Sequence, residues 1–216
     1  MNHLESCNEL TTARLRLRPV QEHDVQPVFE IYGDPRTQVH NPAGPLSNIE
    51  SAANMVRKWL AHWDKHSFGQ WAVRFTATPN EVIGFVGVTY RMYGEVEHLN
   101  LGYRLKPNVW GRGIATEVAT RATRFAFVEL GQPELFALVR PSNLESIRVL
   151  EKLGMLRHGT LADPAHNSLS LVYRAARDAQ PFVPGLPTWS RSADPDTKRS
   201  ARLHSDGVVV TANPSL

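Results

Sequence analysis

The sequence predicts one α/β (α+β) domain built on a mixed, mostly antiparallel central sheet of roughly six to seven strands, flanked by about four helices. A chain of 216 residues, 42% of them hydrophobic, is long enough for one well-buried core and short for two full domains. Apolar runs with short links, at residues 70–75, 82–90 and 98–105, indicate an antiparallel meander. A glycine-containing turn then joins the last of these runs to a long amphipathic helix.

Local patterns ahead of the meander predict a strand followed by helices. Residues 14–18 alternate between arginine and leucine, which is typical of a half-buried strand. Asp24 is placed to cap a short helix that ends before a breaker-rich loop over residues 33–46. The run Ser47-Asn48-Ile49-Glu50 has the form of a capping box, so we expect a second helix from there to Gly69.

His62 and His66 stand four residues apart on that second helix, a spacing that a metal pair can use. No third ligand is placed nearby, and the glutamate of a zinc-protease motif is absent. We therefore expect both histidines to lie on a solvated surface, and we expect no metal site.

The pattern after the glycine turn predicts further helices and strands. An amphipathic helix covers about residues 112–130, and the apolar run at residues 135–139 is typical of a strand covered on both faces. A second capping box, Ser142-Asn143-Leu144-Glu145, begins a helix that ends at Gly154. Weaker strand signals follow at residues 155–161 and 169–174.

Composition sets the expected domain boundaries. Residues 14–176 carry the periodic segments and form the predicted domain, preceded by a polar leader over residues 1–13. Residues 177–216 scatter prolines among serine and aspartate with little apolar periodicity, which indicates an irregular or disordered tail.

The charge balance argues against nucleic acid and membranes as partners. The net charge is only +3, and no long run of like charges appears. No apolar run approaches the roughly 18 residues that a membrane span needs, and the N-terminus lacks the features of a signal peptide. The single Cys7 excludes an internal disulfide framework. We therefore expect a soluble cytoplasmic protein, present as a monomer or homodimer.

The turn Trp110-Gly111-Arg112-Gly113-Ile114-Ala115-Thr116-Glu117 has the features of an anion site. Its glycines allow a sharp backbone turn, and the helix that follows offers unpaired N–H groups and a positive dipole end. A phosphate is the anion that this arrangement favours. The lysine of a nucleotide P-loop is missing, and an antiparallel meander does not open a dinucleotide-binding unit.

Further sequence blocks accompany this turn in a characteristic order. They are Gly84-Phe85-Val86-Gly87, Leu101-Gly102-Tyr103-Arg104-Leu105, the turn itself, Asn143-Leu144-Glu145-Ser146, and Glu151-Lys152-Leu153-Gly154-Met155. On these blocks residues 14–174 resemble the GCN5-related N-acetyltransferases (GNAT), and more closely the branch that acetylates the N-termini of ribosomal proteins. The resemblance implies the acyl-CoA N-acyltransferase fold and acetyl-CoA as the cosubstrate.

The resemblance also assigns residues to acetyl-CoA. The turn implies a cradle for the coenzyme diphosphate, with backbone contacts from Gly111, Arg112, Gly113, Ile114, Ala115 and Thr116. The pantetheine arm is expected along the end of the preceding strand, at Tyr103, Arg104 and Leu105, and the Leu105 N–H is expected to polarise the thioester carbonyl. Arg112 meets a phosphate or is a solvated loop residue, and Asn143 binds the arm or only terminates its strand. Asn108 departs from the Gln or Arg with which the family usually opens the cradle.

The catalytic pair is less completely matched. Relatives often carry a tyrosine acid where this chain has Leu150, whereas the ribosomal-protein branch points to Ser146 as the proton donor. The other interpretation of Ser146 is a contact with the coenzyme or the helix backbone. The usual glutamate base is replaced by Asn100, which leaves His98 on the same strand face, or a path through bulk water.

These observations support an acetyl-CoA-dependent N-acetyltransferase that acts by direct attack in a ternary complex. The expected acceptor is a primary amine: a protein N-terminus, an antibiotic amine, a polyamine or an amino acid. We expect its pocket between the 33–46 loop, the helix over residues 47–68 and the turn at residues 161–169. The alternative is a catalytically weak acyl-CoA-binding or sensor module, since the usual tyrosine and glutamate are both missing.

Overall fold

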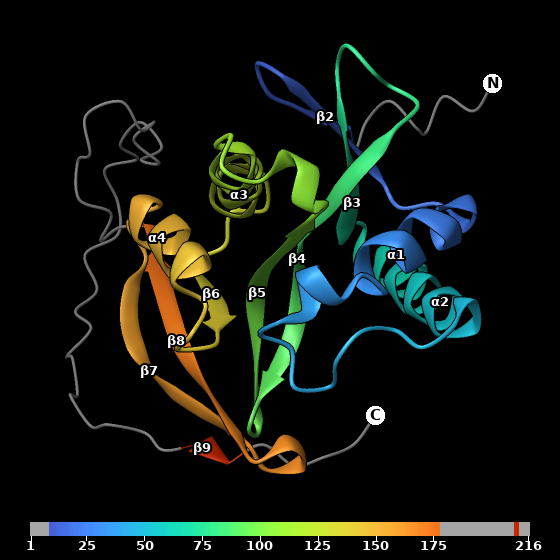
Figure 1. Cartoon of the computed structure of the whole chain (residues 1–216). Coiled ribbons are helices and arrows are strands. Elements are labelled where there is room, and N and C mark those ends of the chain that lie inside the picture. Colours follow the sequence, from blue (N-terminus) through green and yellow to red (C-terminus); the bar gives the residue numbers. More distant parts are fainter. Residues whose placement is uncertain (1–8, 178–209, 212–216) are drawn as a thin grey trace, which may run out of the picture.

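A mixed β-sheet runs through the centre of the protein, with helices on both of its faces (Figure 1). The computed structural model describes residues 9–177 and 210–211. The strands lie in the order β1-β2-β3-β4-β5-β6-β8-β7-β9. The strands are β1 (Leu10–Thr11), β2 (Leu15–Pro19), β3 (Gln70–Phe75), β4 (Val82–Tyr93), β5 (Val96–Leu105), β6 (Glu134–Val139), β7 (Leu156–Asp163), β8 (Ser168–Ala176) and β9 (Val210–Thr211).

The sheet is antiparallel except where β5 meets β6 and where β7 meets β9. This confirms the predicted fold class and the meander of β3, β4 and β5. Over the residues that the structure describes, the sheet has nine strands, more than the six to seven predicted from the sequence. The two outermost strands, β1 and β9, are each two residues long, too short to leave an alternating pattern in the sequence.

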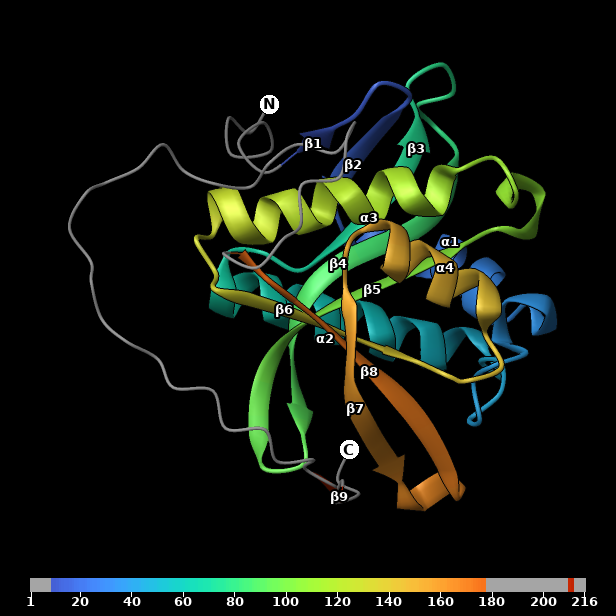
Figure 2. The same cartoon turned by 90° about the vertical axis from the view of Figure 1, so that its left-hand side faces the viewer.

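The helices form a layer on each face of the sheet. They are α1 (Val25–Tyr32), α2 (Ile49–His66), α3 (Ile114–Arg124) and α4 (Leu144–Lys152). Side chains of α1 and α2, such as Ile31 and Val56, share one buried cluster with Phe85. Side chains of α3 and α4, such as Val118 and Leu150, share the other. Figure 2 shows the α3 and α4 layer facing the viewer.

The helix ends differ from the predicted ones in detail. Asn48, not Ser47, is the N-cap of α2, because its side chain accepts a hydrogen bond from the Ser51 N–H at 2.9 Å. Asp24 stands at the N-cap of α1 but makes no side-chain cap bond. Its buried carboxylate instead pairs with Arg18 at 2.5 Å. The α-helix predicted over about residues 112–130 begins at Ile114 and continues as a π-helix over Phe125–Glu129.

Two short stretches of the predicted leader and tail belong to the sheet. Leu10 and Thr11 of the leader pair with β2 as β1, and Val210 and Thr211 of the tail pair with β7 as β9. Cys7 and most of the tail lie outside the described residues. Within residues 9–177 and 210–211, no helix combines the length and apolar character needed to span a membrane.

Strands β5 and β6 separate soon after they meet. Their parallel pairing consists of one residue pair, Asn100 with Phe136, although β5 continues to Leu105 and β6 to Val139. Beyond this pair the described chain offers no strand partner to the open side of β5. The sheet therefore contains a gap directly before the glycine turn.

Candidate active site

The glycine turn has left-handed backbone where its glycines stand. The φ angles are 71° at Gly111 and 76° at Gly113, a region that side chains with a Cβ rarely adopt. Gly113 is the N-cap of α3, and no side chain of the described residues caps that end of the helix. The first N–H groups of α3 therefore remain available to an anion.

The space around this turn is open. A Cβ added at Gly111 would meet no atom within 4 Å, and one at Gly113 would meet only a guanidinium nitrogen of Arg14 at 3.8 Å. The backbone of the turn can thus be approached closely by a ligand.

Glu117 anchors the turn to the first strands. Its carboxylate pairs with the Arg14 guanidinium at 2.6 Å and accepts a hydrogen bond from the Thr12 hydroxyl at 2.5 Å. Burial alone would raise the pKa of Glu117, but these bonds lower it overall, so the group stays ionised at neutral pH. Arg14 also donates to the backbone oxygen of Arg112 at 3.2 Å, which holds the centre of the turn.

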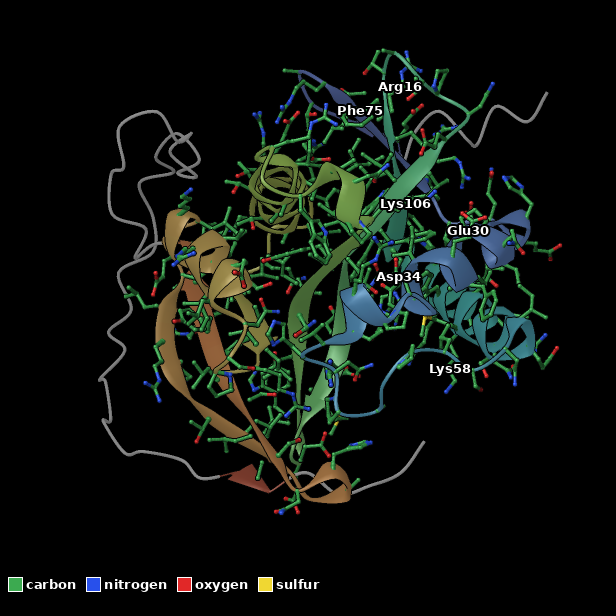
Figure 3. All side chains as sticks on the ribbon, in the orientation of Figure 1. Arg16, Glu30, Asp34, Lys58, Phe75 and Lys106 are labelled. Atoms are coloured by element: carbon green, nitrogen blue, oxygen red, sulfur yellow. The ribbon has the colours of Figure 1, made fainter. Side chains whose placement is uncertain are left out.

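The side chain of Arg112 packs on an aromatic ring. Its guanidinium lies 5.2 Å from the ring centroid of Phe75, which Figure 3 labels beside Arg16 at the upper end of the sheet. On the other side of the turn, the Trp110 indole N–H donates to the Leu105 oxygen at 2.9 Å. This bond fixes the start of the turn to the end of β5.

The end of β5 is also tied to its neighbours. The Lys106 N–H donates to the Ile83 oxygen of β4 at 2.8 Å, and the Lys106 ammonium lies 3.3 Å from Glu30 of α1, both labelled in Figure 3. Because antiparallel pairs alternate in the direction of their backbone groups, this bond turns the N–H groups of Leu105 and Tyr103 away from β4. They face the gap between β5 and β6.

A cavity of about 460 Å³ passes through this gap and joins the two faces of the sheet. On the α1 and α2 face it is lined by Tyr32 and Trp59. On the α4 face it is lined by Asn143, Ser146 and Leu150. The cavity thus brings Tyr103 and Arg104 together with Asn143 and Ser146, whereas Leu105 is not among the lining residues.

Asn143 has a structural role in this cavity. Its Oδ1 accepts from the Ser146 N–H at 3.1 Å and so caps α4. The Nδ2 donors of Asn143 have no hydrogen-bond partner among the described residues. Asn143, not Ser142, is thus the N-cap of α4, a role different from the strand termination considered from the sequence. Its Nδ2 end remains open to a ligand.

Tyr103 reaches the same part of the cavity from β5. Its hydroxyl lies 3.5 Å from the backbone oxygen of Ser146. Burial raises the pKa of Tyr103 to about 12, so the phenol is protonated at neutral pH. The sequence pointed only to the backbone of Tyr103, because the position of a phenol across the gap depends on how β5 and α4 pack.

His98 lies apart from Ser146. Its imidazole packs against Phe136 with 4.2 Å between ring centroids and is not among the described residues that line the cavity. Burial lowers the pKa of His98. Asn100, two residues along the strand, does line the cavity, and its Oδ1 accepts from the Tyr93 hydroxyl at 2.7 Å.

The segments predicted to line an acceptor pocket match the lining of this cavity only in part. Residues of the 33–46 loop, such as Thr37 and Asn41, line the cavity together with Trp59 of α2, but no residue of the predicted 161–169 turn is among them. Arg104 was missed as a side chain. It lies 4.8 Å from the ring centroid of Tyr32 and donates to the Thr37 oxygen at 3.0 Å. The sequence signal that could have identified the Arg104 side chain as functional is a charged residue within an otherwise apolar strand.

His62 has a different environment from the solvated surface predicted for it. Its Nε2 accepts from the Tyr90 N–H at 3.1 Å, so Nδ1 carries the proton and donates to the Phe68 oxygen at 2.8 Å. This half-buried ring links α2 to β4. No group of three metal-ligating side chains occurs among the residues that the structure describes.

Comparisons with known proteins agree with this geometry. The Acetyltransferase (GNAT) domain family matches residues 14–156. The uncharacterized N-acetyltransferase YoaA of Bacillus subtilis (strain 168) is 26% identical over 152 residues, which is 70% of this chain and 85% of that protein. The crystal structure of an acetyltransferase from Agrobacterium tumefaciens str. C58 is 28% identical with a TM-score of 0.67, covering 81% of this chain and 98% of that one.

A further structure, Mycobacterium smegmatis RimJ in complex with CoA-disulfide, has a TM-score of 0.61 at 20% identity, covering 78% of this chain and 84% of that one. At this identity the likeness concerns the fold.

Proposed function

Because the chain belongs to the GNAT family of acetyltransferases, it is an acetyl-CoA-dependent N-acetyltransferase, and we propose that it transfers the acetyl group directly to a primary amine in a ternary complex. Family membership favours this enzyme over a sensor that only binds acyl-CoA. The observation that carries the proposal is the open glycine turn at the uncapped start of α3, next to the gap between β5 and β6.

In this proposal the turn binds the coenzyme diphosphate. The N–H groups over residues 111–116 would donate to phosphate oxygens, supported by the dipole of α3. Arg112 would act through its backbone, since its guanidinium packs on Phe75. Glu117 is compatible with a nearby phosphate because Arg14 neutralises it.

The pantetheine arm would then follow the gap. The backbone groups of Tyr103 and Leu105 face this gap and would pair with the amides of the arm as a neighbouring strand does. The Nδ2 donors of Asn143 would contact the arm from α4. This arrangement supports placing the thioester in the cavity near Leu105.

The chemistry requires two proton movements. The reaction forms a C–N bond and breaks the C–S bond of acetyl-CoA, while the amine loses a proton and the sulfur gains one. The Leu105 N–H would polarise the carbonyl, and Ser146 would donate the proton to sulfur. For the proton of the amine, the packing of His98 against Phe136 outside the cavity favours release to water.

The two substrates would enter from opposite faces of the sheet. The coenzyme reaches the cavity from the α3 and α4 face, where the turn and Ser146 lie. The amine would enter from the α1 and α2 face, past Tyr32, Trp59 and the 33–46 loop. We include the N-terminus of a protein and small amines among the acceptors, with the ribosomal-protein branch as the closest precedent in sequence pattern.

Gly113→Val tests the cradle. It adds a branched side chain at the turn, so we expect acetyl-CoA affinity to fall at least roughly 30-fold, measured by calorimetric titration. Gly131→Val is the matched control: Gly131 also has a left-handed φ, 66°, and a Cβ there meets no atom within 4 Å. Both variants carry similar backbone strain, of roughly 1–2 kcal/mol. Equal coenzyme affinity in the two would refute the cradle.

A further inference from the structure

The charges around the cavity are all of one sign. Its lining contains three arginines, Arg91, Arg104 and Arg140, together with His40, and no described aspartate or glutamate is among the lining residues. An amine acceptor that is itself a polycation, such as a polyamine, would find no counter-charge there. This distribution favours an acceptor that brings a negative group with it.

The three arginines differ in their partners. Arg140 pairs with Asp163 at 3.2 Å, and Arg91 lies exposed at the mouth of the cavity. Arg104 is partly buried, and none of the described carboxylates lies within ion-pair distance of it. Its contacts are the Thr37 oxygen and the face of Tyr32.

The partial burial of Arg104 without a carboxylate partner requires an explanation. Burial lowers the pKa of Arg104, although the guanidinium keeps its proton at any ordinary pH. The contact with Tyr32 and the bond to Thr37 hold it in place but leave further N–H donors of its planar fork unused. A carboxylate matches such a fork in geometry and charge.

Arg104 also lies on the acceptor side of the sheet. Side chains alternate along β5, so Arg104 is on the face opposite to Tyr103, whose hydroxyl approaches Ser146. It contacts α1 and the 33–46 loop through Tyr32 and Thr37. The backbone of the same residue is next to the expected position of the thioester, so an anion bound here is close to the reacting amine.

We propose that Arg104 binds a carboxylate of the acceptor, so that the enzyme acetylates amines that carry a carboxylate close to the amino group. This inference rests on the proposed function for the identity of the site. The carboxylate comes either from a free amino acid or from an acidic side chain near the N-terminus of a peptide. Arg104 acts here in substrate recognition and takes no part in proton transfer.

The test measures binding rather than turnover. Protein saturated with CoA is titrated calorimetrically with matched ligand pairs that differ in one carboxylate. Free L-amino acids are compared with their carboxamides, and C-terminally amidated peptides with Asp or Glu in second position are compared with the same peptides carrying Asn or Gln. An acid preference in the first set would identify a free amino acid as the source of the carboxylate. An acid preference in the second set would identify an acidic peptide.

We expect at least one acid to bind roughly tenfold or more tightly than its amide partner, and we expect Arg104→Gln to abolish that preference. Arg104→Lys should restore part of it, since the charge returns without the planar fork. Arg124→Gln, which removes an exposed arginine at the end of α3, is the control and should keep the preference.

An acid preference that survives in Arg104→Gln would overturn the inference, as would binding of acids and amides with equal affinity, or no binding of any acid. Turnover is assayed separately by CoA release. Acid binding without turnover of any amine would contradict the proposed acetyl transfer and leave the assignment of Arg104 standing.

Discussion

At the level of single residues, the hydroxyl groups of Ser146 and Tyr103 are two candidates for protonation of the leaving sulfur. Both line the α4 side of the cavity, and the Tyr103 hydroxyl lies 3.5 Å from the Ser146 backbone oxygen. Burial raises the pKa of Tyr103 to about 12, so its phenol stays protonated at neutral pH and has a proton to donate, as does the Ser146 hydroxyl.

Because the sequence motif favours Ser146 as the acid, Ser146→Ala is expected to lower kcat by roughly 10²-fold, with a smaller change in the KM for acetyl-CoA. Tyr103→Phe removes only a hydroxyl and is the matched comparison, expected to change kcat less than Ser146→Ala does. Steady-state kinetics with saturating amine measures both variants. A larger loss of kcat in Tyr103→Phe than in Ser146→Ala would indicate that Tyr103 is the acid.

His62 gives a prediction about pH. Burial holds the pKa of His62 below the ordinary imidazole value of 6.5, although the hydrogen bond to the Phe68 oxygen opposes this shift. As the pH falls through 6.5, the unfolded chain takes up this proton before the folded protein does, so the folded state loses stability. Protonation of Nε2 also removes its bond to the Tyr90 N–H.

We expect His62→Gln to have a smaller drop in unfolding free energy between pH 7.5 and pH 5.5 than the wild type. Urea unfolding at the two pH values measures this difference. His158→Gln removes an exposed histidine and should retain the wild-type drop. A drop in unfolding free energy in His62→Gln equal to that of the wild type would contradict the prediction.

The positions of candidate site residues were predictable where a motif carries them. Asn143, Ser146 and the glycines of the turn stand at fixed positions in recognisable blocks. Arg104 and the hydroxyl of Tyr103 were not predictable as cavity groups, because their roles depend on contacts with α1, the 33–46 loop and α4. The same holds for His62, whose partners lie on β4 and beyond the end of its own helix.

At the level of elements, the close approach of β4 to β5 positions the end of β5. A Cβ added at Gly84 of β4 would lie 2.6 Å from the Arg104 oxygen and 3.0 Å from Leu105 Cα. Both atoms belong to backbone that cannot move without shifting the strand. The close packing of β4 against β5 therefore explains why glycine occupies position 84, independently of any ligand.

Gly84→Ala is expected to lower the free energy of unfolding by about 1–3 kcal/mol, because the added methyl forces β5 away from β4. Gly159→Ala in β7 is the control, since a Cβ there meets no atom within 4 Å. Denaturant unfolding compares the two variants. If Gly84→Ala were as stable as Gly159→Ala, the close contact would not constrain β5.

Most elements were predictable from local signals: alternation indicated β2, apolar runs indicated the strands of the meander, and capping residues indicated the starts of α2 and α4 to within a residue. The short strands and the π-helix were not. A two-residue strand such as β1 exists only because β2 supplies its partner. The π-helix at Phe125–Glu129 differs from an α-helix in hydrogen-bond register, which apolar spacing does not reveal.

At the level of the whole molecule, the sheet consists of two parts joined side by side through one residue pair, Asn100 with Phe136. The order of the strands around the turn was predictable from the sequence, but the distances between neighbouring strands were not. His98 illustrates this limit: strand alternation correctly sets its face, while its distance from the cavity depends on where along β5 the strands separate.

Because of this gap, binding of the proposed coenzyme arm should change amide hydrogen exchange at the end of β5. In the free protein the N–H groups of Tyr103 and Leu105 face the gap, with no strand of the described chain to pair with them. An arm bound there would supply acceptors, so amide hydrogen exchange at these residues should slow by roughly tenfold or more at saturating CoA. Ligand at 100 times its Kd also stabilises the fold by about 2.7 kcal/mol.

Hydrogen exchange followed by mass spectrometry, with and without CoA, measures this protection. Peptides covering Val73, a buried residue of β3 outside the cavity, report the general stabilisation, and the effect on β5 must exceed theirs. Gly113→Val at the same CoA concentration should show neither effect, because the cradle no longer holds the diphosphate. Protection of residues 111–116 without any at residues 103–105 would mean that the coenzyme binds the turn while its arm takes a path outside the gap.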